Sequence, residues 1–423
     1  MTKIPDLGTR SQVGALYGAM QDALGNKDGI HGNEEKPKGS LDETSFFDRQ
    51  PALNRMKSAA ATGLSAQDEQ ERLERFVTAQ EERWGTPTST LKAGDVPDFE
   101  RFRVEKAIAL TRFGRRPEDV VDTVVPARGS VDGQAIAPRD LFTQHWKPIG
   151  EPSGTVVVLS PGFLQTGRNF YEQVDLLNRQ GHDVVVMDHQ WAGYGSGSKG
   201  GIDRGFGVAR DVAAVAAYAQ QLAADTYGDG RLVLMGTSMG AGAGVFSAIT
   251  MNDAGKVALE GPQMPTGLSA VLQAPYFDKT PTLINQGLAA QGLAALGRVP
   301  FLKQLALPSI GLPILAKDDD INVKLAQHAS AEGVVARAEA FNASNADLKR
   351  VRELLDSGQQ PRGRFYFIHG DEDPLASLEA AREVAGKLGE RAEFLQPKSG
   401  NHVMEAGKEK ALMLEGLSWV LKP

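Results

Sequence analysis

A serine with glycines on both sides stands between a predicted strand and a predicted helix. Ser238 is the centre of the pentapeptide Gly236–Gly240, which follows an apolar run and precedes a stretch of small residues. So sharp a turn places the serine in unfavourable backbone geometry, and the two glycines remove the Cβ atoms that would clash where strand and helix converge. The pattern predicts that Ser238 presents its hydroxyl at a sheet edge as a nucleophile. The alternative is an ordinary turn serine.

A serine hydroxyl is a weak nucleophile that needs a base, an acid to orient the base, and N–H donors for the oxyanion. Acidic residues follow the predicted strand 364–368, with Asp373 the preferred acid and Asp371 the reserve. His402 lies in a loop after the predicted strand 392–395 and is the candidate base. Structural roles are the alternatives. Asp373 could be a helix N-cap, because Asp is favoured at an N-cap that precedes a proline, and His402 could be a surface loop residue.

The elements that must position these residues alternate from about residue 118 onward. An opening hairpin is predicted from 120–125 and 141–146, separated by a turn at 128–133. Helical stretches such as 210–223 separate several of the later strands. Continuous apolar runs predict strands buried on both faces at 155–159, 183–187, 231–235, 268–272, 364–368 and 392–395. The pattern indicates an α/β protein with a mostly parallel, doubly wound sheet.

The remaining segments divide the chain into five parts. Residues 1–65 are polar and glycine-containing and are expected to form a flexible leader, and 66–117 to form a helical extension with helices at 66–84 and 99–113. The core comprises 118–277 and 363–423, interrupted by a helical cap or lid at 278–362. Residues 283–315 are rich in leucine, which suits either a lid lined for an acyl chain or the cap's own core. The extension could pack on the core or bind a partner.

Composition narrows the classes of function. The chain has 423 residues, a formal net charge of −7, no cysteine and seven scattered histidines. The acidic balance gives no reason to expect nucleic acid as a partner, and we expect neither a metal nor a cofactor. No apolar run approaches the roughly 18 residues of a transmembrane helix, and no secretory signal is evident near Met1. A cytoplasmic location is the default expectation, and the oligomeric state is not readable from the sequence.

Four motifs together resemble the α/β-hydrolase superfamily, most closely its monoacylglycerol lipase or lysophospholipase-type branch, over residues 118–423. The first is the G-x-S-x-G elbow around Ser238. Segment 159–163 resembles the branch's His-Gly oxyanion motif, with Pro161 in place of histidine. Segment 188–197 resembles D-x-x-G-x-G-x-S, with two extra residues before its first glycine and Gly197 in place of the serine. Segment 370–374 matches G-x-x-D-P, which selects Asp373.

The resemblance implies roles for further residues. The backbone N–H groups of Phe163 and Met239 would form the oxyanion hole, and Pro161 lacks the side-chain donors that histidine would supply to that loop. Leu164, Trp191 and Phe277 are candidates for contact with substrate. His189 could also border the pocket, although loop packing explains His189 and Trp191 equally well, and His369 is expected to be structural.

The resemblance implies a cofactor-independent serine hydrolase acting on small-molecule acyl esters, with a modest preference for lipid-like chains. One alternative is acyl transfer on the same triad, in which an alcohol, amine or thiol replaces water. Another is a ligand-binding or scaffold protein without turnover, whose N-terminal hundred residues dock a partner. Haloalkane and epoxide chemistry is disfavoured, because members with those activities carry aspartate at the elbow.

Overall fold

The computed structural model describes residues 66–96, 99–131, 134–162, 165–189, 193–195, 207–250, 257–259, 267–277, 345–373, 376–398, 400, 402 and 406–422. The predicted leader, 1–65, and residues 278–344 of the predicted cap lie outside these ranges. The five-part division of the chain therefore stays a prediction.

A sheet of nine strands forms the centre of the described fold, in the order β6-β1-β2-β4-β3-β5-β7-β8-β9. The strands are β1 (Val120–Val131), β2 (Gln134–Trp146), β3 (Thr155–Ser160), β4 (Asp183–Met187), β5 (Arg231–Thr237), β6 (Val257–Leu259), β7 (Ser269–Gln273), β8 (Phe365–Ile368) and β9 (Ala392–Leu395). The pairs from β4 through β3, β5, β7 and β8 to β9 are parallel. The pairs β1–β2, β1–β6 and β2–β4 are antiparallel. The predicted mostly parallel sheet is confirmed.

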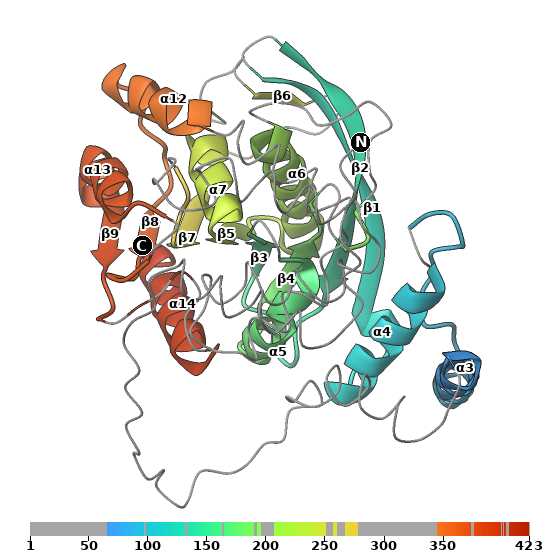
Figure 1. The fold of residues 1–423 in the computed structure, drawn as a ribbon. Helices are drawn as coiled ribbons and strands as arrows, with labels where there is room; N and C mark the ends of the chain where they lie inside the picture. Colours follow the sequence, from blue (N-terminus) through green and yellow to red (C-terminus); the bar gives the residue numbers. More distant parts are fainter. Residues whose placement is uncertain are drawn as a thin grey trace, which may run out of the picture. The chain divides into compact units, whose positions relative to one another are not determined.

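Helices cover both faces of this sheet (Figure 1). Successive side chains of a strand point to opposite faces, so Val156 and Val158 pack in one core cluster while Val157 and Leu159 pack in the other. The first cluster includes residues of α6, α7, α12 and α13, and the second includes residues of α4, α5 and α14. The helices are α3 (Ala66–Trp84), α4 (Phe99–Arg112), α5 (Tyr171–Arg179), α6 (Gly207–Tyr227), α7 (Met239–Thr250), α12 (Asn345–Asp356), α13 (Leu378–Leu388) and α14 (Ala406–Val420). Short 3₁₀ turns occur at η1 (Pro117–Asp119), η2 (Gly167–Phe170) and η3 (Gly389–Arg391).

The opening hairpin is longer than the sequence pattern indicated. Pairing of β1 with β2 continues outward to Val131 and Gln134, with a register shift between Ala127 and Gly129. The turn predicted at 128–133 is therefore wrong at 128–131, which is strand. These outer residues lack a continuous apolar run, and their backbone pairs with β6, which the sequence analysis missed. A strand of only three residues offers too little pattern to be seen.

Helices α3 and α4 occupy the predicted N-terminal extension, and α4 packs on the core. Ala109 and Leu110 of α4 are buried in the cluster that contains Val120 and Trp146. Phe102 packs against Phe142 and Tyr194 in a smaller cluster. At the other end of the chain, α12 lies within the predicted cap, yet its Val351 and Leu354 are buried in the core cluster with α7. That end of the predicted cap therefore packs as part of the helical layer.

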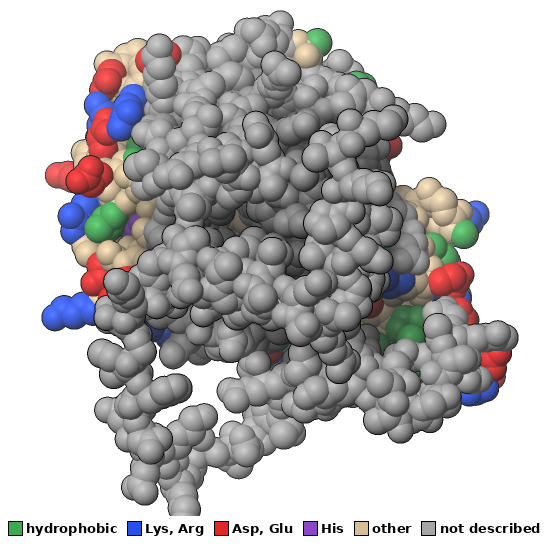
Figure 2. Space-filling view, in the orientation of Figure 1, with side chains coloured by type: hydrophobic (Ala, Val, Ile, Leu, Met, Phe, Trp, Pro, Cys, Tyr) green, Lys and Arg blue, Asp and Glu red, His purple; other side chains and the backbone are tan. Residues whose placement is uncertain are grey.

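The described surface over α12 and α13 carries mixed charge (Figure 2). Arg352 pairs with Glu383, and Lys387 pairs with Asp356 at 2.5 Å. Within the described residues, no helix has the length and apolar character required to cross a membrane.

Candidate active site

Ser238 occupies a strained turn between β5 and α7. Its φ of 53° lies in the left-handed region that side-chain-bearing residues rarely adopt. A Cβ at Gly240 would fall 2.4 Å from the carbonyl oxygen of Ser160, and a Cβ at Gly236 would fall 2.7 Å from Cα of Ala241. The two glycines therefore permit the close approach of β5, α7 and β3 that the elbow requires.

Backbone hydrogen bonds hold this turn in place. The N–H of Ser238 donates to the carbonyl oxygen of Gln273 at 2.8 Å. The carbonyl oxygen of Ser238 accepts from the N–H groups of Gly242 and Tyr276, both at 3.0 Å. The bonds with Gln273 and Tyr276 fasten the elbow to the end of β7, and the bond with Gly242 joins it to the first turn of α7, so the surrounding fold compensates the strain.

The structure brings Ser238, His402 and Asp373 together in one line. Nε2 of His402 lies 2.8 Å from Oγ of Ser238. Nδ1 of the same ring lies 2.8 Å from Oδ2 and 3.0 Å from Oδ1 of Asp373. Ser238 is 6% exposed and His402 4% exposed, so little water screens these contacts. With Nδ1 protonated, the ring donates to the carboxylate and its Nε2 accepts from the serine hydroxyl.

The two aspartates of the loop after β8, Asp371 and Asp373, make different contacts. Asp373 accepts from the N–H of Ala376 at 3.0 Å as well as from His402. The N-cap of α13 is Ser377, so Asp373 does not cap that helix. Asp371 instead accepts from the N–H of Gly400 at 3.1 Å and so ties this loop to the one that carries His402. Asp373, not Asp371, contacts the histidine.

A second histidine lies behind Asp373. His369 is fully buried, and its Nδ1–H donates to the carbonyl oxygen of Gly370 at 2.9 Å. Burial lowers the pKa of His369, which favours the neutral ring. Its Nε2 lies 3.9 Å from Asp373, beyond hydrogen-bond distance.

The loop after β3 lies against the serine. A Cβ at Gly162 would be 3.1 Å from Cβ of Ser238. The N–H of Gly162 donates to Oε1 of Gln165 at 2.8 Å, and the N–H of Gln165 donates back to the carbonyl oxygen of Gly162 at 3.2 Å. Nε2 of His189 lies 2.9 Å from the carbonyl oxygen of Pro161, which can only accept, so His189 donates. Gln165 and His189 thus hold this loop.

The sequence analysis missed this role of Gln165, whereas for His189 it gave loop packing as one of two interpretations. The available signal was the spacing of Gln165 three residues after Gly162, which allows a side chain to return to a backbone N–H. Phe163, Leu164 and Trp191 lie outside the described residues, and their roles stay predictions. Met239 begins α7, where N–H groups have no acceptor within the helix. Phe277 is 2% exposed in the core cluster, and its contact with substrate stays a prediction.

A buried acid lies close to this site. Burial raises the pKa of Glu409 on α14 to about 7, against a hydrogen bond from Gln273 and the charge of Lys410, which both lower it. Gln273 is the residue whose carbonyl oxygen accepts from Ser238. Among the described residues, no histidine, aspartate and glutamate side chains cluster in a way that could hold a metal ion.

A family model described as serine aminopeptidase, S33, matches residues 150–402, which is more than half of the chain. The chain belongs to the S33 family. The match includes Ser238 and Asp373 and ends at His402. Together with the sheet topology, membership makes this S33 protein a hydrolase of the α/β-hydrolase superfamily. A search of curated protein sequences finds no significant match.

Several solved structures are similar to this S33 protein. A monoacylglycerol lipase from Paleococcus ferrophilus is 18% identical, with 66% of this chain and 98% of that chain covered and a TM-score of 0.45. An esterase from Exiguobacterium antarcticum is 17% identical, with 71% and 99% covered and a TM-score of 0.48. A bromoperoxidase from Bacillus anthracis is 18% identical, with 71% and 100% covered and a TM-score of 0.46. These three proteins carry different named activities.

Proposed function

We propose that this S33 protein is a serine hydrolase that cleaves carboxylic esters through an acyl-enzyme. The observation that carries the proposal is the line from Asp373 through His402 to Ser238, with 2.8 Å at each junction. Membership of the S33 family supports the hydrolase class. The Leu-rich segment 283–315, which lies outside the described residues, favours acyl chains of medium or long length.

The proposed reaction has two halves. Oγ of Ser238 attacks the ester carbonyl while Nε2 of His402 takes the hydroxyl proton, and Asp373 stabilises the imidazolium. The negative oxygen of the tetrahedral intermediate accepts from the N–H groups of Met239 and Phe163. His402 then returns the proton to the leaving alcohol, which leaves an acyl-serine. Water attacks this ester by the same route, releases the carboxylic acid and restores Ser238.

The test is hydrolysis of p-nitrophenyl esters from acetate to palmitate by the full chain and by Ser238→Ala. We expect wild-type activity that rises toward long chains and falls at least about 10³-fold in the variant. The matched control is Ser247→Ala in α7. Oγ of Ser247 lies 2.8 and 2.7 Å from the carbonyl oxygens of Ala209 and Ala243, one of which accepts its proton. This control variant should retain activity.

Three results would contradict parts of this proposal. Equal activity of wild type and Ser238→Ala would exclude the serine as nucleophile. Hydrolysis of aminoacyl p-nitroanilides with no hydrolysis of esters would move the protein to peptidase chemistry. Activity confined to the acetate ester would contradict the prediction of a lipid-like substrate, while the prediction of an ester hydrolase would stand.

A further inference from the structure

We propose that helix α4 of the N-terminal extension positions the segment that follows the oxyanion loop, with Glu105 as a positioning residue that acts through Arg168. This inference rests on the proposed function for its catalytic consequence. The segment is 167–172, which comprises η2 and the start of α5 and directly continues the loop beside Ser238.

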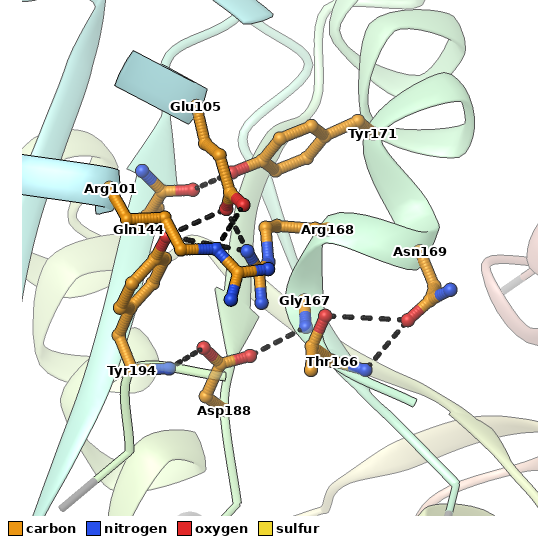
Figure 3. Close-up of polar contacts among 10 residues, drawn as sticks. All are labelled: Arg101, Glu105, Gln144, Thr166, Gly167, Arg168, Asn169, Tyr171, Asp188 and Tyr194. Carbon is orange, nitrogen blue, oxygen red and sulfur yellow. Dashed lines mark hydrogen bonds and ion pairs between the residues drawn. The ribbon is translucent and has the colours of Figure 1, made fainter. Parts of the chain in front are cut away.

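The carboxylate of Glu105 lies at the centre of a charged cluster between α4 and two loops of the core (Figure 3). Glu105 forms an ion pair with Arg168 of η2, and Nε of Arg101 donates to its Oε1 at 2.8 Å. The hydroxyl of Tyr194 donates to its Oε2 at 2.6 Å. The guanidinium of Arg168 also lies over the ring of Tyr194, 4.7 Å from its centre. Burial raises the pKa of Tyr194, so the phenol stays protonated and donates.

Asp188 joins the same two loops at the backbone. Its Oδ1 accepts from the N–H of Gly167 at 2.7 Å, and its Oδ2 accepts from the N–H of Tyr194 at 2.8 Å (Figure 3). Asp188 is 2% exposed at the end of β4. Asp188 therefore holds the loops after β3 and β4 through their backbone N–H groups, and Glu105 of α4 holds the same loops through the side chains of Arg168 and Tyr194.

A buried polar chain links α4 to the first residue of α5. Nζ of Lys106 lies 2.5 Å from Asp122 of β1, and Nε2 of Gln144 donates to the same carboxylate at 2.9 Å. The hydroxyl of Tyr171 donates to Oε1 of Gln144 at 2.6 Å (Figure 3). Lys106 is 2% exposed and Gln144 1% exposed. Buried polar chains that satisfy their members rigidify the elements they join.

A third contact lies further along α4. Nη2 of Arg112 lies 3.0 Å from Oε1 of Glu172 on α5, and Glu172 also pairs with Lys410 of α14. One helix thus bonds to 168 and 172 directly and to 171 through the polar chain. Since oxyanion donors stabilise charge that exists only in the transition state, a looser loop should lower kcat rather than raise KM.

The test compares Glu105→Gln with Glu100→Gln in the full chain. Glu100 is a matched control, because it lies on α4 and pairs with Arg103 at 2.9 Å but its side chain is 52% exposed. We expect Glu105→Gln to lower kcat on a p-nitrophenyl ester about tenfold with KM within twofold, and Glu100→Gln to match wild type. Glu105→Gln should also accelerate hydrogen exchange in residues 160–172.

Hydrogen exchange separates the failure of this inference from that of the proposed function. If no ester is hydrolysed but exchange in 160–172 rises only in Glu105→Gln, the proposed reaction fails and the positioning role stands. If exchange and kcat in Glu105→Gln equal those of Glu100→Gln, the positioning role is overturned while the hydrolase stands.

Discussion

At the scale of single residues, the proposed chemistry depends on a serine held in an unfavourable conformation. The positive φ of Ser238 aims its hydroxyl at His402, and three backbone bonds, two of them to the segment that ends β7, retain that geometry. Gly240 is the point of closest approach, because its Cα faces the carbonyl oxygens of Ser160 and Pro161. The elbow and the loop after β3 are therefore packed against each other.

A methyl group at Gly240 should disturb both the elbow and the loop after β3. In Gly240→Ala, the added Cβ would fall 2.4 and 2.5 Å from those two oxygens, so the backbone must shift. We expect a loss of about 1–3 kcal/mol in the free energy of unfolding, together with loss of esterase activity. Gly386→Ala on α13 is the control, since nothing lies within 4 Å of its Cβ, and it should be neutral or slightly stabilising. Urea unfolding of both variants measures this, and equal stabilities would refute the packing argument.

Residue types and their order in the chain sufficed to predict which side chains meet at the site. They did not predict the hydrogen bonds that hold the neighbouring loop in place. Ser238, Asp373 and His402 each follow a strand, where their side chains reach a common edge. Gln165 and His189 act on backbone groups of the loop after β3, a role that leaves no periodic pattern in the sequence. The packing of Phe277 in the core was equally invisible, because an aromatic residue after a strand suits a pocket as well as a core.

At the scale of elements, the parallel strands explain why distant residues converge. The carboxyl ends of β3, β5 and β8 bring the loop beside Ser238, the elbow and the loop of Asp373 to one edge of the sheet. Continuous apolar runs made these strands predictable, since they are buried on both faces. The outer hairpin and β6 were not predictable, because backbone pairing rather than apolar burial defines them. The burial of α12 depends on tertiary contacts, which the helical pattern does not specify.

At the scale of the whole molecule, helices from both ends of the chain converge on α5. Arg112 of α4 and Lys410 of α14 share Glu172, and α14 also buries Glu409 beside Gln273. A carboxyl whose pKa is about 7 in the folded protein binds its proton more tightly than in the unfolded chain, where the usual value is 4.5. Its contribution to stability is therefore present below about pH 4.5 and is lost as the pH rises through 7.

Replacing this carboxyl by a neutral amide should remove that pH dependence. We expect Glu409→Gln to match wild type near pH 5 and to exceed its stability near pH 8 by up to about 3 kcal/mol. Thermal unfolding at both pH values measures the difference. Glu390→Gln, at an exposed position of η3, should change neither value. A variant less stable than wild type at pH 8 would show that the ionised carboxylate stabilises the fold.

The most direct test of the central claim is to label the full chain with a fluorophosphonate and locate the adduct by mass spectrometry. Such reagents require an activated serine rather than a pocket. The tryptic peptide from Leu232 to Lys256 contains Ser238 and also Ser247, so fragment ions must distinguish the two. We predict one adduct on Ser238 that is absent from Ser238→Ala and strongly slowed in His402→Ala. A folded protein that stays unlabelled, or that is labelled on another residue, would contradict the account.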